Sequence, residues 1–421
     1  MVINVNDFDY NIEFLKLEKE KNKYKNKPDY ANLICAFDIE TTNIDDIQQS
    51  IMYIWQFQIG LDITIIGRTW DEFKSFMDRL DDMLDELTLV IYVHNLSFEW
   101  QWLKSILHID KVFAMDDRKV LYFISNHFEF RCSYLHSNMN LDKFVEKMGA
   151  EHKKIKGFDY DKKRYSWTKL TNKELLYCIN DVRALVEAIT NELEKDGDDL
   201  YSIPYTSTGY VRREFKKVML PMQKEVRKML PDLEVFEGLR ACFRGGNTHA
   251  HRGNAGRIIH NVYSYDISSS YPSVMLTEEY PTKFTKQDPK KLWLALKHNR
   301  ACLMHIQLVD VRLRDNNFGC PYLAVGKCNN IINALEDNGR ILSCDSLNCW
   351  INEIDLKILL MEYDFDYEIL KLYTSPKKKL PEAFRKLLFG MYEKKTLLKG
   401  GDDEYAYTKY KNMINSVYGM T

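Results

Sequence analysis

One long amphipathic pattern, TNKELLYCINDVRALVEAITNELEK at residues 171–195, predicts a helix that must be covered along one face. Thr171 and Glu174 are spaced as a capping box, so the helix is predicted to begin directly after Thr171. The preceding residues are rich in strand-like segments, and a sheet built from them can cover the apolar face of the helix. About 200 residues are therefore predicted to form one domain of the α/β (α+β) class.

The strand-like segments before this helix are apolar or alternate in polarity, and Gly60 marks a turn between two of them. The predicted strands are residues 31–37, 51–60, 61–69, 87–95, 119–124 and 127–133. Residues 71–87 instead repeat Phe, Met and Leu at helical spacing, with acidic residues on the other face. Residues 1–30 carry a run of charge and are predicted to be a mobile or helical extension. A domain boundary is predicted near residues 201–210.

Composition narrows the class of protein. The 421 residues suggest two or three domains, and 45% apolar residues are enough for their cores. A net charge of −2 does not indicate a polyanionic partner. Basic clusters occur locally, but any one of them can equally be a solvated surface. Nine cysteines, the absence of a signal-peptide pattern and the absence of an apolar run of about 18 residues predict a soluble, cytoplasmic protein with no membrane partner.

Acidic side chains occur at three places in the predicted first domain. Asp38 and Glu40 end a strand and alternate onto one face of it. Glu99 follows a later strand, and Tyr177 and Asp181 are one turn apart on the long helix. Each place alone has an ordinary explanation, such as a solvated strand edge or a helix surface. Together they supply four carboxylates, which can hold two divalent ions about 3.5–4 Å apart and hydrolyse a phosphodiester.

Two motifs stand out in the second half. VYSYDISSSYPSVM, residues 262–275, reads as a strand ending at Asp266, whose carboxylate can hold Mg²⁺ while the amides after it approach a triphosphate. The simpler reading is a strand that leaves through a serine-rich turn. At the other end, KYKNMINSVYG, residues 409–419, reads as a helix that carries Lys411 and Asn415 on one face, with Gly419 as its C-cap.

The three acidic segments resemble exonuclease motifs I, II and III of the proofreading domain in family B DNA polymerases, an RNase H-like 3′–5′ exonuclease of the tyrosine-bearing class. The resemblance implies that Asp38, Glu40 and Asp181 carry two Mg²⁺ (or Mn²⁺) ions, with Tyr177 orienting a water molecule. Glu99 stands where the family usually has aspartate. The resemblance further implies a catalytic lysine at Lys156 and contacts to single-stranded DNA from Thr41, Asn95, Phe98 and Ser133.

The second half resembles the polymerase motifs of the same family. Asp266, Ser269 and Tyr271 match motif A, where the aspartate holds metal and the other two contact the incoming nucleotide. Lys411, Asn415 and Tyr418 match motif B, and Lys394 resembles a second lysine for the triphosphate. The segment CFRGGNT resembles the linker motif that contacts DNA, through Phe243, Arg244, Gly245 and Gly246. In that motif, Phe243 replaces the usual tyrosine.

The segment between motifs A and B is much longer than in most family B enzymes, which resembles the protein-primed subgroup of phages and linear plasmids. The implied function is a DNA-directed DNA polymerase with proofreading, and its partners are primer-template DNA, dNTPs and a terminal protein primer. The expected regions are 31–205 (exonuclease), 206–282 (linker and palm), 283–375 (an insertion that binds the terminal protein) and 376–421 (fingers).

A family B palm also needs the second aspartate of motif C, Y-x-D-T-D-S, which the sequence does not contain. The chain is therefore expected not to polymerise alone, and three interpretations remain open. In the first, the chain is the N-terminal part of a polymerase that is completed by a second polypeptide or by readthrough of a stop codon. In the second, it is a free-standing 3′–5′ exonuclease. In the third, it is a non-catalytic module that binds DNA or terminal protein.

Overall fold

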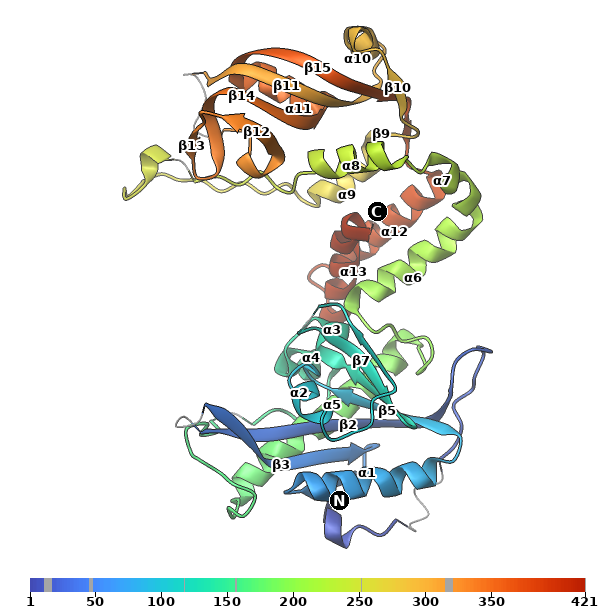
Figure 1. Ribbon diagram of the computed structural model, residues 1–421. Coiled ribbons are helices and arrows are strands. Elements are labelled where there is room, and N and C mark those ends of the chain that lie inside the picture. Colours follow the sequence, from blue (N-terminus) through green and yellow to red (C-terminus); the bar gives the residue numbers. More distant parts are fainter. Residues whose placement is uncertain are drawn as a thin grey trace. The chain divides into compact units, whose positions relative to one another are not determined.

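The computed structural model describes residues 1–10, 17–44, 48–116, 118–155, 157–250, 252–314 and 321–420 (Figure 1). The chain divides into two units that are each compact. The first contains residues 1–213 and 394–416, and the second contains residues 214–393 and 417–421. The predicted fingers region, 376–421, is thus divided between the two units, because its sequence forms two helices that each cross a unit boundary.

An eight-stranded mixed sheet forms the centre of the first unit, in the order β1-β4-β3-β2-β5-β8-β7-β6. Strand β2 lies at its middle, antiparallel to β3 and parallel to β5. The strands are β1 (Val2–Asn4), β2 (Asp29–Ile44), β3 (Gln49–Ile59), β4 (Ile63–Gly67), β5 (Leu87–Val93), β6 (Lys111–Ala114), β7 (Val120–Ser125) and β8 (Phe128–Cys132). All six predicted strands are confirmed.

Helices cover both faces of this sheet. They are α1 (Trp70–Leu84), α2 (Trp100–Leu103), α3 (Ser133–Ser137), α4 (Leu141–Met148), α5 (Asn172–Asp196), the first part of α6 (Ser207–Met219) and most of α13 (Glu404–Val417). Alternation along β2 separates the faces: Phe37 packs into the core with α1, whereas Ala36 packs into the core with α4 and α5. Both capping boxes, at Thr69 and Thr171, are formed, which confirms the predicted start of α5.

The predicted N-terminal extension is wrong for its first residues. Strand β1 pairs in parallel with β4, and Val5 and Phe8 are buried in the core with α1. The physical reason is that the first eight residues contain well-spaced apolar side chains, and the charge run begins only after them. Residues 1–8 therefore belong to the sheet domain.

Helix α13 packs on the C-terminal half of α5 through a buried polar cluster. The Tyr405 hydroxyl donates to Glu192 Oε1 at 2.9 Å and to Asp196 Oδ2 at 3.0 Å, and Lys409 pairs with Asp196. The other oxygen of Glu192, Oε2, lies 2.6 Å from His136 Nε2. The helix that carries the motif B residues is thus held by the helix that carries Tyr177 and Asp181.

The His136–Glu192 pair predicts a pH dependence of stability. Burial lowers the pKa of His136, but the Glu192 carboxylate outweighs it and the net shift from 6.5 is upward. The stability that this histidine adds is therefore full below pH 6.5 and is lost as the pH rises through its raised pKa. Urea unfolding at pH 6 and pH 8.5 should show a larger loss in the parent than in His136→Gln. Equal losses would contradict a charged His136.

The second unit is built on a six-stranded antiparallel sheet, in the order β10-β15-β11-β14-β12 with β13 paired to β14. Its strands are β10 (Thr285–Gln287), β11 (Ala301–Leu313), β12 (Cys328–Ile332), β13 (Leu335–Asp337), β14 (Arg340–Asn352) and β15 (Tyr363–Ser375). A separate pair joins β9 (Glu279–Pro281) to β16 (Lys377–Lys379). The six-stranded sheet lies wholly within the predicted insertion, residues 283–375.

The helices of the second unit are the last part of α6, α7 (Gln223–Met229), α8 (Leu233–Cys242), α9 (Ser270–Thr277), α10 (Leu292–Lys297), α11 (Glu353–Glu362) and the first part of α12 (Glu382–Leu398). Helix α8 contacts β11 and β14, and Gly238 permits this approach because a Cβ there would lie 2.8 Å from the Trp350 ring. Helix α11 begins with a capping box between Asn352 and Asp355.

Two local predictions in this part of the chain are wrong. The predicted strand at Asp266 is an irregular, solvent-exposed segment, with Tyr265 91% exposed. Its apolar residues have strand propensity, but no other described segment pairs with its backbone, and a strand needs such a partner. Gly419 does not cap α13 in a left-handed conformation, because the helix tightens into a 3₁₀ turn at Tyr418–Met420.

Candidate active site

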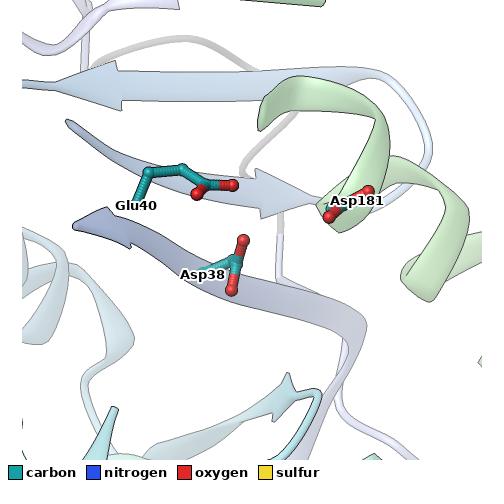
Figure 2. Close-up of side chains that lie close together, drawn as sticks. All are labelled: Asp38, Glu40 and Asp181. Atoms are coloured by element: carbon teal, nitrogen blue, oxygen red, sulfur yellow. The ribbon is translucent and has the colours of Figure 1, made fainter. Parts of the chain in front are cut away.

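Three carboxylates from two elements meet in the first unit. Asp38 and Glu40 project from β2, and Asp181 projects from α5, which packs against that strand. One oxygen from each residue lies within 4.8 Å of the others, and Figure 2 shows the three groups turned toward one another. A register shift in the β2–β3 pairing directly after Glu40 marks an irregularity of the kind often found beside active sites.

The electrostatics of this cluster favour a bound cation. Burial raises the pKa of Asp38 well above its usual value, and the neighbouring Glu40, Glu99 and Asp181 raise it further. Burial and Asp181 raise the pKa of Glu40 to about 8. Carboxylates packed this closely repel one another when ionised, and a divalent cation would remove that repulsion.

The donor atoms also fit a metal. Asp181 Oδ1 and Glu99 Oε2 are buried and have no hydrogen-bond partner among the described residues. All of the available ligands are carboxylate oxygens, which suit Mg²⁺ or Mn²⁺ rather than zinc or iron. The residues present therefore fit the hard divalent ions that the sequence predicts.

Glu99 lies beside the cluster without joining the group of three. It directly precedes α2 and is 3% exposed. Besides burial and Glu40, its charge raises the pKa of Asp38, so the Glu99 and Asp38 carboxyl groups are neighbours. Burial is the largest cause that raises the pKa of Glu99, to about 8. Its position next to Asp38 is consistent with metal binding through its longer side chain, and that role stays a prediction.

Lys154 was not identified as a site residue from the sequence, yet its ammonium group lies beside the cluster. Its Nζ lies 3.3 Å from Asp181 Oδ2 and 5.6 Å from the centre of the Tyr177 ring. The amide of Asn180 on α5 donates to the Lys153 carbonyl at 3.1 Å and so fixes this part of the chain. The predicted catalytic lysine, Lys156, lies outside the described residues. Three lysines stand in four positions here, and the sequence offers no signal that selects Lys154.

Tyr177 is held firmly at the edge of the cluster. It is 3% exposed, its ring stacks on Phe158 at 4.1 Å, and its hydroxyl lies 2.7 Å from the hydroxyl of Tyr160. Tyr160 is a second residue that sequence reasoning missed. It is 69% exposed and therefore accessible from solvent. The two hydroxyls together can hold a water molecule or a phosphate oxygen near the carboxylates.

The residues predicted to contact single-stranded DNA differ in exposure. Asn95 is exposed and has a left-handed backbone, with φ of 69°, and Phe98 is 43% exposed. Thr41 is half-buried on β2 next to Glu40. Ser133 is fully buried, and its hydroxyl lies 3.0 Å from His94 Nδ1. Ser133 is thus not accessible to a ligand in this structure, and its predicted contact with DNA stays a prediction.

The predicted nucleotide-binding residues fall in both units. In the second unit, Tyr271 of α9 packs against Tyr418 with ring centres 4.4 Å apart and ring planes tilted by 31°, so this motif A and motif B pair is brought together. Ser269 precedes α9 with a left-handed φ of 52°, and Asp266 lies in the exposed segment before it. Within the described ranges, Asp266 belongs to no group of three or more His, Cys, Asp or Glu side chains that could hold a metal ion.

The other predicted nucleotide-binding residues belong to the first unit. Lys411 and Asn415 are both exposed on α13. Lys394 of α12 is also exposed, and its Nζ lies 3.2 Å from the hydroxyl of Tyr410. These three side chains are therefore accessible to a solvent-borne ligand.

The predicted DNA-binding linker lies at the end of α8. Phe243 is 58% exposed, and Gly245 and Gly246 are exposed with open space where a Cβ would stand. Arg244 points into the second unit instead of into solvent: its Nε lies 3.6 Å from Asp355, and its guanidinium lies 4.7 Å from the centre of the Tyr322 ring. Arg244 thus anchors the loop, whereas Phe243 and the glycines remain accessible.

Comparison with known proteins adds the following. Residues 102–421 match the model of a family described as DNA polymerase type B, organellar and viral. The fold is similar to phi29 DNA polymerase complexed with primer-template DNA, with a TM-score of 0.72 at 18% sequence identity, covering 92% of this chain and 67% of that chain. It is also similar to phi29 DNA polymerase complexed with single-stranded DNA, with a TM-score of 0.69 at 18% identity and the same coverage. No curated protein sequence matches.

The likeness to phi29 DNA polymerase confirms the predicted α/β fold class. At 18% identity it speaks for the fold, and the roles of individual residues rest on their geometry. Across the described ranges, none of the helices has the length and apolar character needed to cross a membrane.

Proposed function

The chain belongs to the organellar and viral type B DNA polymerases, and from this premise we propose that its carboxylate cluster hydrolyses the 3′ end of single-stranded DNA. One observation carries the proposal, namely that oxygens of Asp38, Glu40 and Asp181 lie within 4.8 Å of one another. Side chains in this arrangement would hold Mg²⁺ or Mn²⁺ ions, with Glu99 as a further candidate ligand. The bound ions would activate a water molecule and stabilise the departing 3′ oxygen.

The chain's own residues would position the reacting groups. The Tyr177 hydroxyl, fixed by Phe158 and Tyr160, would orient the attacking water. Lys154 would balance the charge of Asp181 and attract the scissile phosphate. Thr41 directly follows Glu40 in the sequence, and Asn95 and Phe98 shortly precede Glu99. These three residues would hold the terminal nucleotides, with the exposed Phe98 ring stacking on a base.

The second half would serve nucleotide addition. The phi29 complexes contain primer-template DNA and, in one case, incoming nucleotides. We extend these ligands to this chain, for each unit by itself. In the second unit, Ser269, Tyr271 and Tyr418 would contact dNTPs, and Phe243, Gly245 and Gly246 would contact DNA. In the first unit, the predicted contacts to dNTPs are Lys394, Lys411 and Asn415. The sheet within residues 283–375 would bind a terminal protein primer, and regions 31–205, 206–282 and 376–421 would act as exonuclease, linker with palm, and fingers.

The exonuclease function has the stronger geometric support. Its carboxylates are assembled, whereas Asp266 lies in an exposed segment and belongs to no group of three or more possible metal ligands among the described residues. The sequence also lacks the motif C pattern that supplies the second aspartate in the family. Two-ion nucleotidyl transfer needs that second ligand. Residues 1–421 alone are therefore expected to degrade single strands but not to extend a primer, unless a further polypeptide supplies the missing aspartate.

Two assays on the purified chain test this function. The first compares degradation of a single-stranded oligonucleotide and of the same sequence in a blunt duplex, and the single strand should be degraded faster. The second supplies a primer-template and dNTPs, and no template-dependent extension is expected. Binding of DNA without degradation would favour the non-catalytic alternative, and extension by the chain alone would overturn the prediction about Asp266.

Lys154→Met should lower the rate of single-strand degradation by about 10- to 100-fold, because it removes the cation that contacts a metal-binding carboxylate. Lys153→Met is the matched control, since Lys153 is exposed and one residue away. It should retain the parent rate. An equal loss in both variants would mean that general positive charge, and not the Lys154–Asp181 contact, is responsible.

A further inference from the structure

A half-buried tyrosine and an exposed tryptophan form an aromatic pair on the loop between the lysine segment and α5. The rings of Tyr165 and Trp167 are parallel within 3°, with centres 4.9 Å apart. Trp167 is 80% exposed, which is unusual for the largest apolar side chain in a domain with an ample core. Neither residue contributes to the carboxylate cluster or to the predicted polymerase motifs, so the pair has no role in the function described so far.

The loop that carries this pair is fixed in place. The guanidinium of Arg68 donates to the carbonyls of Tyr165 and Thr168, both at 2.9 Å. Arg164 is 2% exposed and donates to the Asp159 carbonyl at 2.7 Å and to Glu174 at 2.9 Å. Because two arginines hold the backbone, the stacked rings are presented ready for a ligand, and little conformational entropy would be lost on binding.

The loop is attached to the strand that carries the catalytic candidates. The backbone amide of Arg164 donates to the Thr42 hydroxyl at 3.0 Å, and Lys163 Nζ donates to the Asn43 carbonyl at 2.5 Å. Thr42 and Asn43 follow Glu40 on β2 by two and three residues. At about 3.3 Å per residue, the attachment points lie within roughly 10 Å of Glu40 along the strand.

The charge around the rings suits a nucleic acid. The segment reads KKRYSWTK from residue 162 to residue 169. Lys163 and Lys169 are exposed, and Lys162 is exposed although it pairs with Glu174 at 2.6 Å. Positive side chains interleaved with exposed aromatic rings are the features by which proteins bind single strands without sequence preference, the cations meeting phosphates and the rings stacking on bases.

We propose that residues 162–169 form a subsite for single-stranded DNA, in which Trp167, supported by Tyr165, stacks on a base upstream of the 3′ terminal nucleotide. The proposal rests on the exonuclease function proposed above and specifies its substrate, a strand long enough to reach from the carboxylates to the loop. The competing interpretation is that Trp167 binds a protein partner. In that case, replacing Trp167 would leave DNA binding unchanged.

The test measures kcat and KM for a trinucleotide and for a 20-nucleotide single strand, in the parent, Trp167→Ala and Trp167→Phe. For Trp167→Ala, KM for the 20-mer should rise about 10-fold with kcat unchanged, because one base loses its stacking partner. The trinucleotide should show no change, and Trp167→Phe should retain most of the affinity. Tyr24→Ala, at an exposed tyrosine of the same unit, is the control.

An unchanged KM for the 20-mer, or an equal rise for the trinucleotide and the 20-mer, would overturn the subsite. Equilibrium binding of a fluorescent 20-mer in EDTA keeps the test independent of catalysis. A parent chain that binds the 20-mer but degrades nothing contradicts the proposed exonuclease alone. Under those conditions, weaker binding by Trp167→Ala still supports the subsite, and unaltered binding still overturns it.

Discussion

Replacing Asp181 by asparagine is expected to lower the rate of 3′ hydrolysis of single-stranded DNA by at least about 10³-fold. Asp181 supplies one of three oxygens that lie within 4.8 Å of one another, and it is the one that α5 contributes. Metal ions stabilise several kcal/mol of developing charge in such reactions, and about 4 kcal/mol corresponds to a factor of about 10³. Asparagine keeps the size of the side chain but removes the charge that holds the ion.

The substitution should leave the fold intact, because Asp181 is surrounded by other carboxylates and burial raises its pKa. Relief of that repulsion should keep the unfolding temperature of Asp181→Asn equal to that of the parent or raise it. Glu194→Gln, an exposed carboxylate on the same helix, is the matched control and should degrade DNA at the parent rate. Near-parent activity in Asp181→Asn would exclude this cluster as the catalytic centre.

Arg131→Met is expected to destabilise the first unit by about 3–5 kcal/mol. The Arg131 and Glu129 side chains are 4% and 3% exposed and pair at 2.8 Å on β8. Arg131 also donates to the Leu200 carbonyl at 3.0 Å, and Glu129 accepts from the hydroxyls of Tyr30 and Tyr205. Methionine keeps much of the volume but leaves the Glu129 carboxylate buried without its cation.

The double variant Glu129→Gln, Arg131→Met separates the loss of the Arg131 contacts from the cost of leaving the Glu129 carboxylate charged and buried. It removes the uncompensated charge, while the amide oxygen of the introduced glutamine can still accept a hydrogen bond from a tyrosine hydroxyl. Its unfolding free energy should therefore lie between those of the parent and of Arg131→Met. Urea unfolding at pH 7 measures all three. A loss below about 1 kcal/mol in Arg131→Met would mean that water reaches Glu129 and that the pair is not buried in solution.

The assembly of the carboxylate cluster could be predicted because it depends on regular periodicity. Alternation in β2 places Asp38 and Glu40 on the face that receives α5, and the spacing of Tyr177 and Asp181 places both near that face. The capping box at Thr171 fixed where α5 begins, and thereby which of its residues face the sheet. The facing residues of a regular helix or strand with clear capping signals can therefore be predicted without knowledge of its tertiary contacts.

The residues that were missed lie in irregular segments. The position of Lys154 depends on a loop held by side chains of α5, among them Glu187 and Asn180, and no local rule distinguishes it from its neighbours. Tyr160 and Trp167 likewise lie on a loop whose path is set by distant partners, Arg68 among them. At Asp266 the error had the opposite origin: the local propensity favours a strand, but no partner strand is present in the described residues.

The exonuclease activity of the carboxylate cluster is tested most directly with a 5′-labelled, 20-nucleotide single strand, incubated with the purified chain in Mg²⁺ and, separately, in EDTA. In Mg²⁺ we expect a ladder of labelled products that shorten by one nucleotide at a time from the 3′ end, and in EDTA an intact oligonucleotide. Internal cleavage, release of the 5′ label, degradation that persists in EDTA or no degradation in Mg²⁺ would contradict that activity.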